Sequence, residues 1–150
     1  MEIEIFRLNI AAPLFYTPVD GADPFNYRKG TEDTRSGEKI FCFELNEAER
    51  VKIEPDRTKL LGTLIFAGKS AAAAPGKGET PGELSWELPK GKYLFTQKRE
   101  ILSREDIITL AVEIQQEGLW QRLKPGKRLC LRYLFEDGSL VTQLFRPFSD

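Results

Sequence analysis

One segment of this 150-residue chain carries the period of an α-helix. Apolar residues recur there every three to four positions, Ser103 precedes them as a capping residue, and Gly118 follows them as a helix-ending residue. The spacing predicts a helix over residues 104–117 with one apolar face for packing on a sheet. That face carries Ile107, Ala111 and Ile114.

The other apolar segments are short and rich in β-branched or aromatic residues, which is typical of strands. An Asp-Gly dipeptide, which favours a two-residue type I′ turn, lies between the apolar runs 129–135 and 140–145. In the resulting hairpin Arg132 lies opposite Gln143, a polar pair among apolar neighbours. Further strands are predicted at 2–10, 39–45, 59–66, 84–88 and 92–96, with a short strand around Val51 and Ile53.

Two segments rich in proline and glycine interrupt this pattern. Residues 11–38 show no helical period and predict a long surface excursion, and residues 67–82 predict a flexible joint. The joint separates an all-β first half from an α+β second half within a single domain, residues 1–150. We therefore predict an α+β fold, mostly antiparallel sheet with one principal helix.

The charge balance and the lack of histidine exclude several classes of function. The 22 lysine and arginine residues are balanced by 23 aspartate and glutamate residues, so no overall field attracts nucleic acid or an anionic membrane. Without histidine the chain cannot build Ser-His, Cys-His or histidine–metal sites. We expect neither a metal nor a cofactor, and any proton transfer has to use carboxylates, lysine, tyrosine or cysteine.

The cellular compartment is predicted from the apolar segments and from the cysteines. No apolar run approaches the roughly 20 residues of a membrane span, and the amino terminus is acidic rather than basic. Cys42 and Cys130 lie in apolar runs, which is typical of buried thiols in a reducing compartment. We predict a cytoplasmic protein with two reduced thiols, and a disulfide between them is the alternative.

Eight large aromatic side chains, among them both tryptophans, lie after residue 82. One helix on a small sheet requires fewer of them, so we predict a groove lined by aromatics that takes a small apolar or aromatic ligand, or a protein partner. Gln143 supplies a polar anchor in this groove. The residues predicted to contact the ligand are Trp86, Tyr93, Trp120, Tyr133 and Gln143.

Two short motifs flank the predicted helix. Residues 88–95 read Leu-Pro-Lys-Gly-Lys-Tyr-Leu-Phe, and residues 142–147 read Thr-Gln-Leu-Phe-Arg-Pro after a Tyr-Leu pair and a turn. With the helix between them, these motifs resemble the effector-binding domain of multidrug-responsive transcription activators, a family also called gyrase-inhibitor-like. The resemblance implies two strand-helix-strand-strand modules around an aromatic groove for lipophilic, often cationic molecules.

The resemblance also bears on ligand charge, because Gln143 stands where the family has a pocket glutamate. An amide offers hydrogen bonds but no charge, so we expect no preference for cations. The predicted function is the binding of a lipophilic or aromatic small molecule. Two alternatives stay open. One is a hydrolase of the same fold that uses a carboxylate or a tyrosine, which a carboxyl with a raised pKa in the groove would favour. The other is a protein-interaction module without a ligand.

Overall fold

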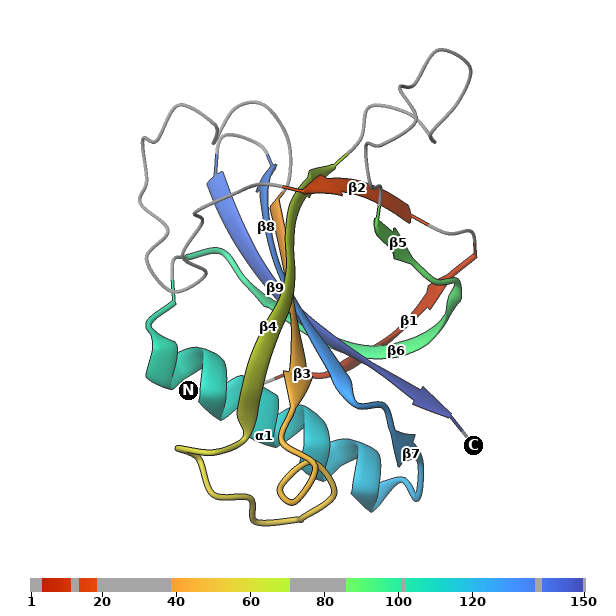
Figure 1. Ribbon diagram of the computed structural model, residues 1–150, viewed down its shortest axis with the longest axis vertical. Coiled ribbons are helices and arrows are strands. Elements are labelled where there is room, and N and C mark those ends of the chain that lie inside the picture. Colours follow the sequence, from red (N-terminus) through yellow and green to blue (C-terminus); the bar gives the residue numbers. More distant parts are fainter. Residues whose placement is uncertain are drawn as a thin grey trace.

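The computed structural model describes residues 4–11, 14–18, 39–70, 86–100, 102–136 and 139–149. Within them nine strands and one helix form, and the strand pairings are antiparallel (Figure 1). The predicted α+β fold, mostly antiparallel sheet with one principal helix, is confirmed. The elements are β1 (Phe6–Ile10), β2 (Leu14–Pro18), β3 (Lys39–Leu45), β4 (Leu61–Ser70), β5 (Trp86–Leu88), β6 (Gly91–Lys98), α1 (Arg104–Trp120), β7 (Lys124–Pro125), β8 (Arg128–Glu136) and β9 (Ser139–Ser149).

Helix α1 starts where the sequence predicts. The Asp106 N–H donates to the Ser103 hydroxyl at 3.2 Å, so Ser103 is the N-cap. Gly118, predicted to end the helix, lies inside it instead. A Cβ at this position would lie 1.9 Å from the Phe148 ring, so the glycine allows close packing of α1 against β9.

The helix ends three residues after its predicted end, in a Schellman motif. Arg122 adopts a φ of 61°, in the left-handed region, and its N–H donates to the Leu119 carbonyl at 3.0 Å. The Leu123 N–H donates to the Gly118 carbonyl at 2.9 Å. In the described part of the chain, no helix is long and apolar enough to cross a membrane.

The apolar face of α1 packs on the sheet as predicted. The β8–β9 hairpin has the predicted register, with Arg132 opposite Gln143 and Tyr133 opposite Thr142. Figure 1 shows α1 lying across the strands. Residues of α1 and of the hairpin form one buried cluster, the helix-side core, which includes Ile107, Ala111, Ile114, Leu129, Leu131, Tyr133, Leu140 and Leu144.

The longer of the other predicted strands all form, and β3 has the predicted bounds. β1 begins at Phe6 rather than at residue 2, and β4 runs to Ser70 rather than to residue 66. Residues 67–70 therefore belong to a strand and not to the predicted joint, because their backbone pairs with β2 and β3. Residues 71–85 lie outside the described residues.

The structure corrects two further predictions for the first half. Within the predicted surface excursion, β2 pairs with β4 and β5, and its Tyr16 is completely buried; residues 19–38 lie outside the described residues. No strand forms around Val51 and Ile53, because the chain turns there and both side chains are exposed. The described part of the first half holds strands and turns but no helix.

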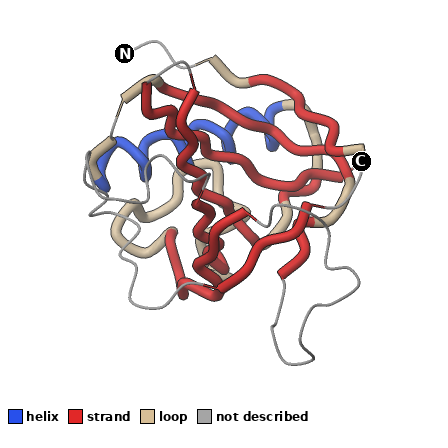
Figure 2. Tube along the Cα trace, turned by 90° about the horizontal axis from the view of Figure 1, so that it is seen from above, coloured by secondary structure: helices blue, strands red, loops and turns tan. Residues whose placement is uncertain are grey.

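The order of the strands shows that the sheet rolls up. From edge to edge the order is β1-β6-β9-β8-β3-β4-β2-β5, and β7 pairs with β9. β5 stands at one end and β6 beside the other end, yet only Pro89 and Lys90 connect them. A link of this length spans at most about 11 Å, so the two ends of the order lie close together. Figures 1 and 2 show the strands curving around accordingly.

The face of the sheet away from α1 carries a second buried cluster, the inner core. Tyr16 and Leu88 reach it from one end of the strand order, and Tyr93 reaches it from the other end. The rings of Tyr93 and Phe145 meet edge to face with centroids 5.7 Å apart. The rolled sheet therefore separates two apolar clusters, since neighbouring side chains on a strand point to opposite faces. Further members of the inner core are Ile10, Ile40, Cys42 and Cys130.

A buried arginine fixes the loop between β3 and β4. Arg146 on β9 donates from Nε to the Gly126 carbonyl at 2.7 Å and from Nη2 to the Arg50 carbonyl at 2.8 Å. Its Nη1 donates to Gln115 Oε1 on α1 at 2.7 Å, and Gln115 Nε2 donates to the Glu49 carbonyl at 3.0 Å. Burial lowers the pKa of Arg146 to about 9. One side chain thus connects β9, α1 and the loop.

Candidate functional site

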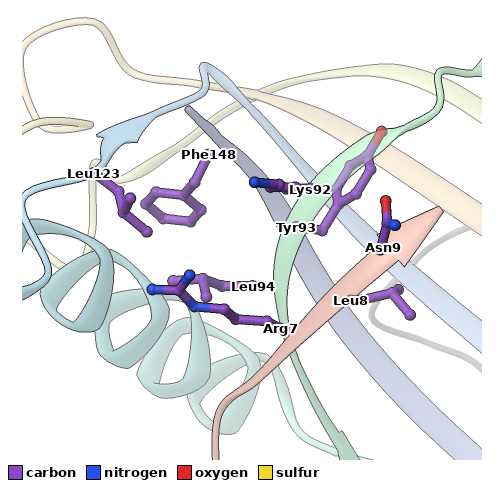
Figure 3. A pocket seen from close by; sticks show the side chains of 8 residues that line it. All are labelled: Arg7, Leu8, Asn9, Lys92, Tyr93, Leu94, Leu123 and Phe148. Atoms are coloured by element: carbon purple, nitrogen blue, oxygen red, sulfur yellow. The ribbon is translucent and has the colours of Figure 1, made fainter. Parts of the chain in front are cut away.

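A pocket of about 170 Å³ lies on the helix side of the sheet, at the edge formed by β1 (Figure 3). β1 pairs with β6 and β6 pairs with β9, so three neighbouring strands contribute to it. The segment that follows α1 contributes Leu123. The lining residues are Arg7, Leu8, Asn9, Lys92, Tyr93, Leu94, Leu123 and Phe148.

The wall of this pocket is apolar. Leu94 and Phe148 are buried members of the helix-side core, and Leu123 packs against that core. Phe148 approaches α1 closely because residue 118 is glycine, and Leu123 is held by the Schellman motif at the helix end. Figure 3 shows these three side chains turned toward one another. The pocket therefore opens the helix-side core to the surface.

Two exposed cations, Arg7 on β1 and Lys92 on β6, lie beside this wall (Figure 3). Arg7 Nη2 donates to Gln121 Oε1 at the end of α1, and Gln121 Nε2 donates to Glu117 Oε1 at 2.7 Å. This bridge holds Arg7 near the helix C-terminus, where the helix dipole favours a positive charge. Lys92 makes no hydrogen bond or ion pair with any residue that the structure describes.

Of the predicted contact residues, Tyr93 lines this pocket, although its ring points away from Phe148 and into the inner core (Figure 3). The Tyr93 hydroxyl donates to the Pro89 carbonyl at 2.6 Å. Burial, together with the neighbouring thiols of Cys130 and Cys42, raises the pKa of Tyr93 to about 12. Tyr93 therefore borders the pocket from its strand, while its ring and hydroxyl are engaged elsewhere.

The two predicted residues of the hairpin lie on opposite faces of the sheet. Tyr133 is buried in the helix-side core, where its ring meets Phe41 edge to face with centroids 6.0 Å apart. Gln143 is on the other face, and its Nε2 donates to Gln97 Oε1 at 2.9 Å. The structure therefore does not bring Tyr133 and Gln143 together in one binding site.

Of the two tryptophans, Trp120 is not among the residues that line the pocket. Trp120 is the last residue of α1 and is 80% exposed. Trp86 lies in β5, where its backbone pairs with Tyr16, and the surroundings of its side chain fall outside the described part of the structure. The predicted groove with all five residues is thus not assembled among the side chains that are described.

A second hollow, of about 430 Å³, lies at the start of α1. Four of its five lining residues are exposed and polar, and Ile108 is the apolar one. The Arg57 guanidinium already donates to the Thr109 hydroxyl and to the Glu105 carbonyl. This hollow is larger, but it lacks an apolar wall, so the smaller pocket is the better candidate for an organic ligand.

Sequence reasoning missed Arg7, Lys92 and Leu123 as site residues. Alternation along the first strand places Arg7 and Asn9 on one face, which was a usable signal. The pairing of β1 with β6 was not visible, because 85 positions separate Leu8 from its partner Tyr93.

The described residues that line the pocket include no aspartate, glutamate or cysteine. No group of three or more cysteine, aspartate or glutamate side chains there is placed to hold a metal ion. Hydrogen bonds lower the carboxyl pKa values of Glu49 and Asp56, and neither residue lines the pocket.

Comparison of the chain with models of known protein families and with curated protein sequences gives no match.

Proposed function

We propose that the protein binds a small ligand that combines an apolar, ring-sized body with an anionic group such as a carboxylate. The observation that carries the proposal is the placement of Arg7 and Lys92 beside an apolar wall in one pocket. The wall removes the body of the ligand from water. The two cations supply charge-assisted hydrogen bonds to the anionic group, which are about twice as strong as neutral ones.

The volume of the pocket sets the size of the ligand. A cavity of about 150 Å³ accommodates benzene, so about 170 Å³ suits a single substituted ring. Benzoate, with about nine non-hydrogen atoms, is therefore a suitable minimal probe. At about 0.5 kcal/mol per atom its binding free energy is about 4.5 kcal/mol, which corresponds to a Kd of about 0.5 mM.

The proposal keeps the aromatic or lipophilic body expected from the sequence and adds a preference for charge. Arg7 and Lys92 repel a cationic ligand, whereas the family resemblance implied a groove that often takes cations. Gln143 lies on the other face of the sheet and does not act on a ligand in this pocket. Lipophilic cations are therefore expected to bind more weakly than neutral molecules of equal size.

The test compares benzoate with the isosteric neutral benzamide by isothermal titration of the full chain. Replacing Lys92 by Met removes the charge but keeps the aliphatic stem. We expect Lys92→Met to weaken benzoate binding about tenfold, or about 1.4 kcal/mol, and to change benzamide binding less than twofold. Lys90→Met is the matched control, because Lys90 is an exposed residue of the β5–β6 turn and does not line the pocket.

Two results would overturn the proposal. The first is benzoate binding no more tightly than benzamide to the unmodified chain. The second is an equal loss of benzoate affinity in Lys90→Met and Lys92→Met, because the effect would then reflect net charge and not the pocket.

The alternatives predicted from the sequence receive less support. A hydrolase that uses a carboxylate would need a carboxyl with a raised pKa at the pocket, and the carboxyl groups with shifted pKa values among the described residues, Glu49 and Asp56, are shifted downward. A hydrolase that uses a tyrosine would need a hydroxyl facing the pocket, and the Tyr93 hydroxyl is bound to the Pro89 carbonyl. The exposed Trp120 favours an interaction module, since tryptophan is enriched among residues that dominate protein interfaces. Trp120 is a single exposed side chain in this argument, whereas the pocket combines an apolar wall with two cations, so ligand binding remains the proposal.

A further inference from the structure

Cys42 and Cys130 face each other across two paired strands. In the antiparallel pairing of β3 with β8 these two residues are direct partners. Both side chains point into the inner core, where Cys42 is 0% and Cys130 is 2% exposed. Their sulfur atoms lie 3.2 Å apart, and both thiols are free.

This geometry is close to that of a disulfide. Directly opposed residues in an antiparallel pair have Cα atoms about 4.5 to 5.5 Å apart, which falls within the range of about 4.4 to 6.8 Å found for disulfides. The sulfur atoms need to approach by about 1.2 Å to reach the bond length of about 2.0 Å. Side-chain rotation and a small strand adjustment are sufficient, and no change of register is required.

The surroundings keep the pair reduced at rest. The hydrogen bond with Cys130 and burial in the inner core raise the pKa of the Cys42 thiol. The charge of Arg128 acts in the opposite direction, but it lowers the Cys42 pKa by less than the hydrogen bond and burial raise it. The hydroxyl of neighbouring Tyr93 is bound to the Pro89 carbonyl. A protonated thiol reacts slowly, because the thiolate is the nucleophile. Burial excludes a large oxidant, whereas a small oxidant reaches the two thiols when the structure opens transiently.

We propose that Cys42 and Cys130 form a redox-active dithiol that a peroxide oxidises to a cross-strand disulfide between β3 and β8. One sulfur, as thiolate, attacks a peroxide oxygen; the O–O bond breaks and the leaving hydroxide takes a proton to form water. The resulting sulfenic acid is attacked by the second sulfur, the S–S bond forms, and the S–O bond breaks with release of a second water. The two thiols lose two electrons, and hydrogen peroxide is reduced to two waters.

The disulfide changes the stability of the fold because the two residues are distant in sequence. It closes a loop across 88 positions, which restricts the unfolded chain strongly. The oxidised protein is therefore expected to melt about 10 °C or more above the reduced protein. This inference does not depend on the proposed ligand.

The experiment treats the reduced full chain with hydrogen peroxide in its folded state. After denaturation and thiol counting, we expect no free thiols, a monomer lighter by two hydrogen atoms, and return of both thiols with dithiothreitol. Cys42→Ala and Cys130→Ala are the matched controls. Each is expected to collect sulfenic or sulfinic acid or to form intermolecular disulfides, without the rise in melting temperature.

Several outcomes would overturn the inference. One is survival of both thiols in the folded protein under peroxide exposure that oxidises the same chain in denaturant. Another is oxidation that adds oxygen atoms or links two chains without an intramolecular disulfide. A disulfide that leaves the melting temperature unchanged would show that the bond formed outside the native pairing. If both alanine variants fail to fold, the mass and melting temperature of the oxidised natural chain still show whether the disulfide between β3 and β8 forms.

Discussion

Adding one methyl group at Gly118 tests the packing that shapes the pocket. In the Gly118→Ala variant the new Cβ would lie 1.9 Å from Phe148 Cε1, 2.5 Å from Cζ and 2.7 Å from Cδ1. Ordinary contacts between carbon atoms are about 3.5 Å or longer, so the ring has to move by more than 1 Å. Phe148 is 8% exposed and its ring lies against the Arg146 guanidinium, 5.6 Å from the centroid, which restricts that movement.

Two opposing effects determine the size of the change. Alanine in a helix interior is favoured over glycine by about 1 kcal/mol. Overpacking of a buried site costs about 1 to 3 kcal/mol, and the clash with several ring atoms indicates the upper part of that range. We therefore expect a net destabilisation of about 2 kcal/mol, equivalent to a fall in Tm of about 4 to 8 °C.

The assay is urea denaturation of the two proteins, followed by titration with benzoate. Because Phe148 forms part of the pocket wall, benzoate affinity is expected to fall together with stability. Phe148→Leu alone and combined with Gly118→Ala completes a double-mutant cycle, in which the smaller side chain relieves the clash. A Gly118→Ala variant that is about 1 kcal/mol more stable and binds benzoate normally would refute the packing described for α1 and β9.

Two further predictions concern the loop between β3 and β4. Arg146→Met leaves the Gln115 Oε1 and two backbone carbonyls without their buried donor, so urea denaturation is expected to show a loss of about 3 kcal/mol. The Asp56 N–H and the Lys52 ammonium lower the pKa of the Glu49 carboxyl. The charged carboxylate therefore stabilises the fold at pH values above the unfolded-state pKa of about 4.3. This stabilisation is lost as the pH falls through the lower folded-state pKa. The urea midpoints of Glu49→Gln and the natural chain are thus expected to differ at pH 7 and to converge below about pH 4, and a constant difference at all pH values would contradict this.

The parts of the fold that follow from local pattern could be predicted from the sequence. The helix start at Ser103 and the register of the hairpin depend on side chains within a few positions of each other. The bounds of β3 follow from a compact apolar run in the same way. Such local preferences survive folding because the tertiary structure agrees with them.

The roll of the sheet and the pocket could not be predicted in this way. Alternation indicates which residues share a face of a strand, but it does not indicate which strands become neighbours. The pocket exists because β1 pairs with β6 and β6 with β9, which brings together Arg7, Leu94 and Phe148 from distant parts of the sequence. Likewise, Gly118 looks like a helix end in sequence, and its role as a contact point emerges only from the position of Phe148.

The most direct test of the proposed binding site is to map benzoate on the protein by titrating ¹⁵N-labelled full chain and following the amide chemical shifts. The proposal predicts that the largest shifts occur at residues 7–9, 92–94, 123 and 148, which line the pocket. The shifts are expected to saturate with one Kd and to be smaller with benzamide at the same concentration. Largest shifts around Arg57 and Arg104, or small shifts spread over the surface, would contradict the account.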